Sequence, residues 1–282
     1  MLAFSMLVSL SFFFGKFIAK DIDPSVLMAL RFALASVVVY IALKAVGLAP
    51  ILTSFWRFLL IGGCMALYFI TMFEALRLTS AVSTSAVFTL TPLLAAGFGW
   101  IFVHQRPRPW LLSALLVGAA GAIWVIFRAD LAALLRFEIG PGEAIFLIGT
   151  IAHGAVPALL QRFCKDVTAL QSAFGTTIGA LIVTCAWAAP DIIATDYIAL
   201  PSRVWWVLAY LAIVTTAGTF ALLQYASKCL PGPKVMAYTY LVPTWVVLSE
   251  IVVLGTYPAP LIFLGIAATL AALLMLLRAE VP

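Results

Sequence analysis

Charged side chains are scarce in this chain of 282 residues: Asp, Glu, Lys and Arg make up 10% of it, and hydrophobic residues 65%. A soluble globular chain carries about 25% charged residues. The shortage excludes an ordinary soluble domain and predicts a membrane protein. The 16 Lys and Arg exceed the 11 Asp and Glu, giving a net charge of +5. Because the basic residues stand singly in short connections, we predict no nucleic-acid partner.

Residues needed for metal, nucleotide and covalent chemistry are also missing. Two histidines, His104 and His153, are too few for a multi-histidine metal site, and the sequence has no catalytic triad pattern or nucleotide-binding glycine loop. The four cysteines form no CxxC pair and are interpreted as apolar packing residues. We therefore predict that the chain is not an enzyme, and we expect no cofactor and no metal.

Long apolar runs, separated by polar or proline-containing breaks, fill almost the whole chain. A bilayer core about 30 Å thick needs roughly 20 apolar helical residues. The first run, Leu2 to Phe14, lacks a basic segment before it and a cleavage site after it, so we expect a retained helix. The sequence thus predicts an all-α membrane protein. Its ten transmembrane helices are placed at 2–20, 24–46, 57–77, 80–103, 109–128, 141–163, 168–189, 203–227, 233–255 and 258–278.

The orientation follows from the basic residues near the helix ends. With the N-terminus in the cytoplasm, nine of them face inward: Lys44, Arg57, Arg106, Arg108, Arg162, Lys165, Lys228, Lys234 and Arg278. Five face outward: Lys20, Arg77, Arg128, Arg136 and Arg203. We therefore expect a multi-pass protein of the cell inner (plasma) membrane with both termini cytoplasmic.

The two halves of the chain repeat one another. The segment Glu74–Arg77 and the pair Thr91–Pro92 recur, at a constant offset, as Tyr225–Lys228 and Val242–Pro243. Because each half holds five helices, an odd number, the second half is predicted to enter the membrane inverted. The expected domains are a first repeat at 1–128, a connecting loop at 129–140 and a second repeat at 141–282. Inverted repeats around a central cavity are typical of secondary transporters.

The chain resembles the drug/metabolite transporter superfamily in its EamA-like branch. The resemblance rests on Ala29–Phe32, Glu74–Ala81 and Pro92, and it is echoed by Leu223–Gly232 and Pro243. It implies ten helices in two inverted five-helix repeats, a central cavity, and export of amino acids or other small metabolites.

Three places depart from this family. Where members often carry Gly-Glu, the chain reads His104-Gln105 and Gly255-Thr256, so a role for those acids is absent. Members also often carry a small polar residue where this chain has Lys16. Lys16 is therefore a candidate for the substrate preference of this chain.

Ionisable residues inside membrane helices cost about 2.5–3.5 kcal/mol each and are the first functional candidates. We expect Lys16, Arg31, Glu74 and Glu250 toward the outer third of the membrane. There they could neutralise one another as structural ion pairs, snorkel to the headgroups, or serve in coupling and gating. Alternatively, Lys16 could bind a substrate carboxylate, and Glu250 a substrate ammonium or a proton.

Other candidates lie deeper in the predicted helices. His153 precedes Pro157 in the sixth helix and could couple transport to protons, or could bond a backbone carbonyl. Pro92 and Pro243 occupy matching places, as hinge or cavity elements or as plain packing kinks. The remaining aromatic candidates could wall a substrate pocket or pack in the core, and these are Tyr68, Tyr238, Tyr240 and Trp245.

The sequence therefore predicts a secondary active transporter that exports small metabolites, amino acids or related compounds, by alternating access. Uptake and the export of cationic drugs are alternatives, and Lys16 disfavours cations. A lipid flippase is a further alternative, which would need a laterally open groove. The expected partners are a small-molecule substrate, the lipid bilayer and protons. A monomer and a homodimer are both compatible with the sequence, because both halves lie in one chain.

Overall fold

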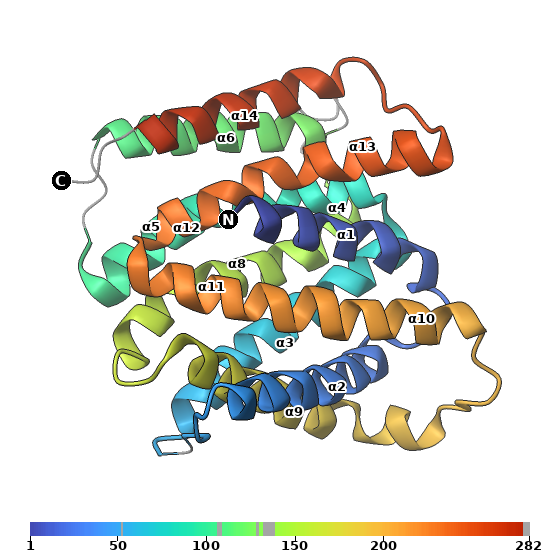
Figure 1. The fold of residues 1–282 in the computed structure, drawn as a ribbon. Helices are drawn as coiled ribbons and strands as arrows, with labels where there is room; N and C mark the ends of the chain where they lie inside the picture. Colours follow the sequence, from blue (N-terminus) through green and yellow to red (C-terminus); the bar gives the residue numbers. More distant parts are fainter. Residues whose placement is uncertain (52, 106–108, 128–129, 132–138, 279–282) are drawn as a thin grey trace.

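The computed structural model describes residues 1–51, 53–105, 109–127, 130–131 and 139–278, and its regular elements are helices (Figure 1). The first half contains α1 (Leu2–Ile18), α2 (Pro24–Ala45), α3 (Trp56–Leu78), α4 (Ala81–Phe88), α5 (Thr91–Val103) and α6 (Pro109–Ile126). The second half contains α8 (Pro141–Phe163), α9 (Ala169–Ala194), α10 (Ser202–Tyr210), η1 (Leu211–Ala217), α11 (Gly218–Cys229), α12 (Gly232–Ala237), η2 (Tyr238–Leu241), α13 (Val242–Leu254) and α14 (Ile262–Arg278).

Eight helical runs in the described part of the chain are long and apolar enough to cross a membrane, by length and composition. Two shorter apolar helices, α1 and α14, accompany them. Most of these runs begin and end within a few residues of the predicted positions. The larger differences are at α9, which ends at Ala194 and not at 189, and at α14, which begins at Ile262 and not at 258.

Two predicted helices are interrupted at matching places. The helix predicted at 80–103 divides into α4 and α5, and the one at 233–255 divides into α12, the 3₁₀ turn η2 and α13. Pro92 and Pro243 each lie in the first turn of the segment after the break. A proline there removes no intrahelical hydrogen bond, because the first N–H groups of a helix have no partner. The two prolines therefore begin new segments and do not kink continuous helices.

Local chemistry explains several helix ends. The Asp23 side chain accepts from the backbone N–H groups of Ser25 and Val26 and starts α2. Thr168 and Gln171 form a reciprocal capping box at the start of α9. Both α5 and α13 end in a left-handed residue, His104 (φ 58°) and Gly255 (φ 65°), so the two halves also match at these ends.

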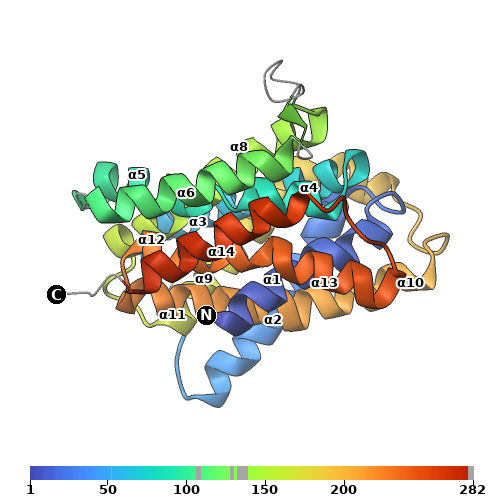
Figure 2. The same cartoon turned by 90° about the horizontal axis from the view of Figure 1, so that it is seen from above.

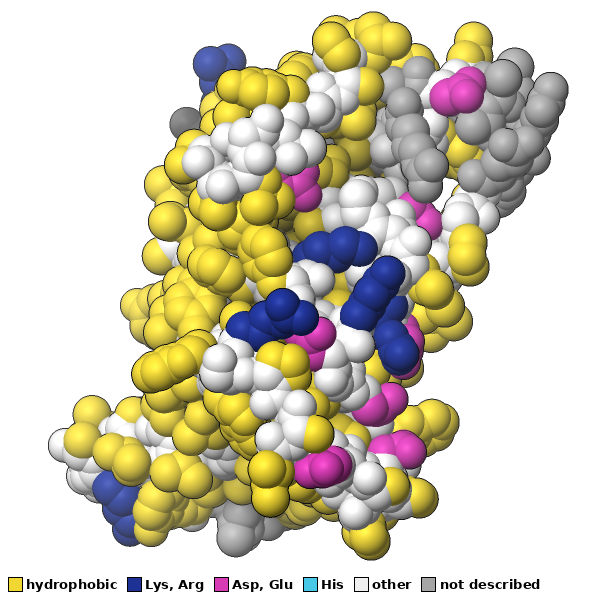
Figure 3. Space-filling view, turned by 90° about the vertical axis from the view of Figure 1, so that its right-hand side faces the viewer, with side chains coloured by type: hydrophobic (Ala, Val, Ile, Leu, Met, Phe, Trp, Pro, Cys, Tyr) yellow, Lys and Arg dark blue, Asp and Glu magenta, His cyan; other side chains and the backbone are white. Residues whose placement is uncertain are grey.

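The helices run between two ends of the molecule, seen at the right and left of Figure 1. At the right, called here the Arg203 end, Arg203 donates to the Asp21 carboxylate at 2.7 and 2.8 Å. At the left, called the Lys228 end, Arg57 at the start of α3 donates to the Phe163 carbonyl at 2.8 Å. Figure 3 faces the Arg203 end, where acidic and basic side chains lie side by side in the middle of the surface.

Charged residues that were predicted to share one side of the membrane lie at the same end of the molecule. Those expected to face inward and found at the Lys228 end include Lys44, Arg57, Arg162, Lys165 and Lys228. Those expected to face outward and found at the Arg203 end are Lys20, Arg77 and Arg203. Arg106, Arg108, Arg128, Arg136 and most of the predicted connecting loop at 129–140 lie outside the described residues.

The α3 helix lies at the centre of the bundle, packed against α8 and α9, while α6 and α14 lie side by side along one edge (Figures 1 and 2). The contact between α3 and α9 is a close backbone approach at Gly62 and Gly179. A Cβ added to Gly62 would lie 2.6 Å from the carbonyl carbon of Gly179. Such small-residue contacts are how membrane helices pack closely without a hydrophobic driving force.

Candidate functional site

A narrow cavity lies in the middle of the bundle, between α1, α3, α8 and α11. Its volume is about 10 Å³, which is room for about one water molecule. The wall is mainly aromatic and aliphatic, which suits apolar solutes. Its polar groups are the side chains of Ser11, His153 and Thr219 and the hydroxyl of Tyr68. The lining residues are Phe4, Val8, Ser11, Met65, Tyr68, Phe69, His153, Thr219, Phe220 and Leu223.

The structure brings Tyr68 and His153, two predicted substrate-binding residues, together in this wall. Their ring centroids are 4.4 Å apart, and the ring of Phe88 lies 5.1 Å from that of His153 and 5.3 Å from that of Tyr68. The His153 side chain is buried, and its Nδ1 has no hydrogen-bond partner among the described residues. A buried polar atom without a partner is costly, so His153 has bonding capacity that a ligand or a water could use.

Arg31 lies directly behind the same wall and is fully buried. Its guanidinium stacks 4.2 Å from the centre of the Phe69 ring. It donates through Nε to Thr216 at 2.5 Å, and through Nη2 to Thr215 at 3.0 Å and to Ser11 at 3.4 Å. Thr215 and Thr216 are consecutive residues of the π-helix η1. The Nη1 atom has no partner among the described residues.

Among the described residues no salt bridge joins any two of Lys16, Arg31, Glu74 and Glu250, although Lys16 and Glu250 attract one another electrostatically. Arg31 does not snorkel, because α9 and η1 pack against α2 and cover it. Glu74 instead pairs with Arg77, one turn away, at 3.4 Å. Lys16 donates to the carbonyls of Leu76 and Thr79, both at 2.6 Å, at the end of α3.

The other predicted pocket residues lie away from the central cavity. Tyr240 is fully buried, and its ring packs against Gly118 in a separate cluster around α6 and α14. Trp245 donates to the hydroxyl of Ser5 at 3.2 Å. Tyr238 is partly buried in η2, and Glu250 is partly buried in α13. Of the six predicted substrate-binding residues, two line this cavity and Lys16, Tyr238, Tyr240 and Trp245 do not.

A second polar group closes the Arg203 end and was not among the predicted site residues. Glu143, in the first turn of α8, is buried and accepts from the hydroxyls of Thr79 (2.6 Å) and Ser83 (2.5 Å). Because Lys16 also donates to the Thr79 carbonyl, this Glu143 network joins α1, α3 and α4 of the first half to α8 of the second. The sequence signal was a carboxylate at a helix N-terminus opposite a hydroxyl-rich helix start.

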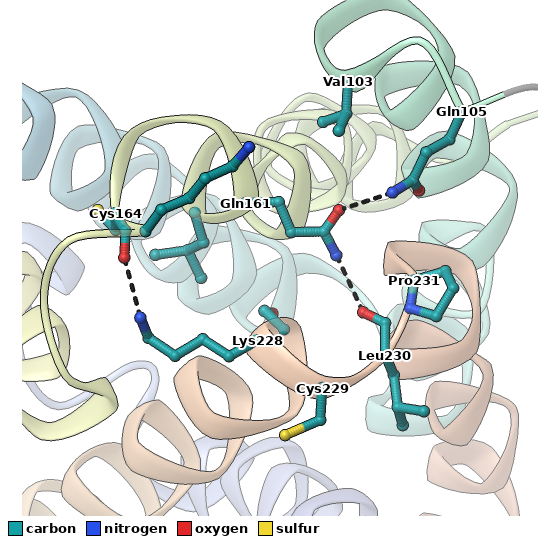
Figure 4. Close-up of a pocket in the computed structure, with 11 residues that line it drawn as sticks. Val103, Gln105, Gln161, Cys164, Lys228, Cys229, Leu230 and Pro231 are labelled. Carbon is teal, nitrogen blue, oxygen red and sulfur yellow. Dashed lines mark hydrogen bonds between the residues drawn. The ribbon is translucent and has the colours of Figure 1, made fainter.

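An open cleft of about 600 Å³, called here the vestibule, lies at the Lys228 end (Figure 4). Gln161 joins its sides, accepting from Gln105 at 3.2 Å and donating to the Leu230 carbonyl at 2.9 Å. Lys228 donates to the Cys164 carbonyl at 3.0 Å. Gln105 places a neutral amide in the lining of the vestibule.

The vestibule and the central cavity share two helices. On α8, His153 lines the cavity and Leu160 the vestibule. On α11, Leu223 and Ser227 are the corresponding pair. At 1.5 Å per helical residue, the α8 pair is separated by about 10 Å along the helix. The cavity and the vestibule therefore lie about two helical turns apart along the same two helices, α8 and α11.

These features define a helical membrane protein of two similar halves, with a polar and aromatic cavity between them. Residues 1–127 and 140–278 each match the EamA-like transporter family. The chain belongs to this family, as the resemblance in its sequence predicts, and it has the two-repeat architecture of the family. Members of the family are membrane transporters, so this is a multi-pass membrane protein.

The fold itself occurs in a solved structure, described only as "Crystal structure of protein". The two chains share 18% sequence identity and superpose with a TM-score of 0.74 over 97% of this chain and 94% of the other. At this identity the likeness establishes the shared fold alone. No curated protein matches the sequence.

Proposed function

We propose that this chain is a secondary active transporter of the cell inner membrane, which exports small metabolites, amino acids or related compounds, by alternating access. The observation that carries the proposal is the arrangement along one axis. An open vestibule lies at one end, a cavity lined by Tyr68 and His153 lies at the centre, and the Glu143 network closes the opposite end. Alternating access requires such a central site with one closed and one open side.

The proposed architecture is ten membrane helices in two inverted repeats. The direction of corresponding helices supports it. The α3 helix begins at the Lys228 end, where Arg57 bonds Phe163, and ends at the Arg203 end, where Lys16 bonds Leu76. Its counterpart from α10 to α11 begins at Arg203 and ends at Lys228. The matching breaks before Pro92 and Pro243 also support a repeat.

The proposed orientation places the Lys228 end and both termini in the cytoplasm. It is supported by the larger number of Lys and Arg residues at this end. The vestibule then opens to the cytoplasm, and a substrate for export enters between α8 and α11. The Glu143 network would open only after the vestibule closes behind the substrate.

The driving force is proposed to be a proton or substrate gradient. His153 is the candidate for proton coupling because it lines the cavity and its Nδ1 has no partner in the described structure. Coupling through this residue requires that a His153→Ala variant lose the dependence of transport on a pH gradient. If that variant keeps the dependence, another group carries the proton.

Flux measurements on purified protein in proteoliposomes test the function. Vesicles loaded with amino acids, organic acids, organic cations or sugars are diluted, and efflux is followed with and without a pH gradient. Efflux of a small solute above that of protein-free vesicles supports the proposal. Translocation of a fluorescent phospholipid without solute flux would favour the flippase alternative, and flux of cations alone would favour the drug-export alternative.

A further inference from the structure

Arg31 is a buried cation without an anionic partner. It is fully buried, and its three hydrogen bonds go to neutral hydroxyl groups, those of Ser11, Thr215 and Thr216. No described acidic side chain forms a salt bridge with it. A buried charge without a counter-charge is energetically costly, and the Arg31 guanidinium is such a charge. A bound anion would compensate it.

The guanidinium lies against the cavity and retains unused donors. Ser11 and Phe69 both line the cavity and both contact Arg31, by a 3.4 Å hydrogen bond and by 4.2 Å stacking. Its Nη1 has no partner among the described residues. His153, which is 3% exposed, adds an unpartnered Nδ1 to the same wall. Arg31 and His153 thus each keep one buried nitrogen atom without a hydrogen-bond partner among the described residues. A guanidinium is the side chain best shaped for a carboxylate.

The remainder of the cavity wall suits hydrocarbon and does not suit a second charge. Its residues include three phenylalanines, Phe4, Phe69 and Phe220, together with Val8 and Leu223. No Asp or Glu is among the described residues that line it. A substrate ammonium buried there would have no anionic partner, and a desolvated, unpaired charge opposes binding.

Resting on the proposed transport function, we propose that the central site takes an apolar organic monocarboxylate that lacks an ammonium group, with Arg31 as its anion anchor. The aromatic wall holds the hydrocarbon part, and His153 bonds the polar head. The cavity of about 10 Å³ is smaller than such a ligand, so binding requires α8 and α11 to separate on the vestibule side. The proposal narrows the substrate class named above to related compounds that carry a carboxylate and no amino group.

A matched set of probes tests the charge preference on the intact protein. The set is 3-phenylpropanoate, L-phenylalanine, 2-phenylethylamine and 3-phenylpropan-1-ol, which share a phenyl ring and differ in charge. Binding to the purified full chain in detergent is measured by ligand-induced stabilisation against concentration. We expect 3-phenylpropanoate to bind at least tenfold more tightly than each of the other three.

Variants then locate the anchor. Arg31→Gln should remove the preference for 3-phenylpropanoate over the alcohol, and Arg31→Lys should keep part of it. Arg57→Gln is the matched control, because Arg57 is also a buried arginine but bonds Phe163 and Asp166 at the Lys228 end. This control should keep the wild-type preference. If Arg31→Gln does not fold, the wild-type series and Arg31→Lys decide.

Three results would overturn the proposal: equal binding of phenylalanine or phenylethylamine, unchanged binding of the acid by Arg31→Gln, or no binding by any probe. Efflux of the same four compounds from proteoliposomes separates this failure from that of the transport function. Export of phenylalanine or phenylethylamine independent of Arg31 would end the carboxylate proposal and leave the transporter intact. An absence of flux for every solute class would end the transporter proposal, whereas the binding preference is measured independently in detergent.

Discussion

At the scale of single residues, the chemistry of the central cavity lies in a few buried polar side chains, among them Tyr68, His153 and Arg31. Tyr68 and His153 were predicted as substrate-binding residues, and both line the central cavity. Arg31 was selected as an intramembrane charge, but its partners are Thr215 and Thr216, more than 180 positions away in the chain. Local patterns carry no information about such a contact. Glu143 was not predicted as a site residue because it lies at a predicted helix start, where acidic residues are common.

The pair of Asp21 and Arg203 gives a pH-dependent prediction. The hydrogen bonds from Arg203 hold the pKa of the Asp21 carboxyl below its ordinary value. A lowered pKa in the folded state adds stability that is present at neutral pH and is lost as the pH falls through that pKa. Asp21→Asn should therefore lower the melting temperature at pH 7, and the difference from wild type should shrink toward pH 3.

Thermal unfolding in detergent at both pH values measures this effect. Asp191→Asn is the control, since Asp191 is exposed and forms no described salt bridge. A loss for Asp21→Asn that is as large at pH 3 as at pH 7 would contradict the role of the ionised carboxylate.

At the scale of helices, the hydropathy pattern predicted which segments are helical and where they lie, but it did not predict the breaks within two of them. Both α5 and α13 begin with a proline in the first turn, yet apolar residues continue across the breaks before them. Hydropathy therefore predicts one run where the backbone has two segments. The hydropathy pattern also did not predict the π-helix η1, which packs against α2, because apolar residues continue through it.

The close approach of α3 and α9 predicts unequal losses of stability at two neighbouring glycines, Gly62 and Gly63. A Cβ at Gly62 would meet the backbone of Gly179 and Ala180, whereas one at Gly63 would have Val183 Cγ2 as its nearest neighbour at 3.8 Å. Gly62→Ala should cost about 1–3 kcal/mol of stability by overpacking. Gly63→Ala should cost little. Melting temperatures in detergent compare the two, and equal losses would show that the helices do not meet at Gly62.

The matching prolines predict an effect on the rate of transport. Pro92 and Pro243 fix the start of α5 and α13, so alanine at either position should allow the break to become continuous helix. We expect each variant to bind substrate as the wild type does and to transport it several-fold more slowly. Initial rates in proteoliposomes, set against binding in detergent, separate the two. Unchanged rates in both variants would assign the prolines to packing alone.

At the scale of the whole molecule, the two-half organisation was predictable because the halves repeat at a constant offset and both match one family. The closed or open condition of each end was not predictable from sequence. The vestibule depends on where Gln105, Gln161 and Leu230 meet, and these residues belong to three separate segments. Tertiary contacts of this kind are set by packing, which helix patterns do not encode.

Orientation in the membrane can be measured through a native cysteine. Cys229 is exposed and lines the vestibule, while Cys64, Cys164 and Cys185 are partly or fully buried. In a variant that retains Cys229 alone, a membrane-impermeant maleimide should label inside-out vesicles and leave right-side-out vesicles unlabelled. Lys20→Cys, introduced without Cys229, is the control at the Arg203 end and should show the reverse. The opposite pattern in both proteins would place the Lys228 end outside.

The hydroxyl partners of Arg31 also have a consequence for how the protein is made. The α2 helix enters the membrane early in synthesis, but Thr216 lies 185 residues further along the chain. At 5–20 residues per second, Thr215 and Thr216 are synthesised roughly 10–40 s after Arg31, whereas its third acceptor, Ser11, is already present. During that interval the first half is a nascent intermediate with a partly satisfied intramembrane charge. We therefore expect the first half to become stable in the bilayer only when the second half packs against it.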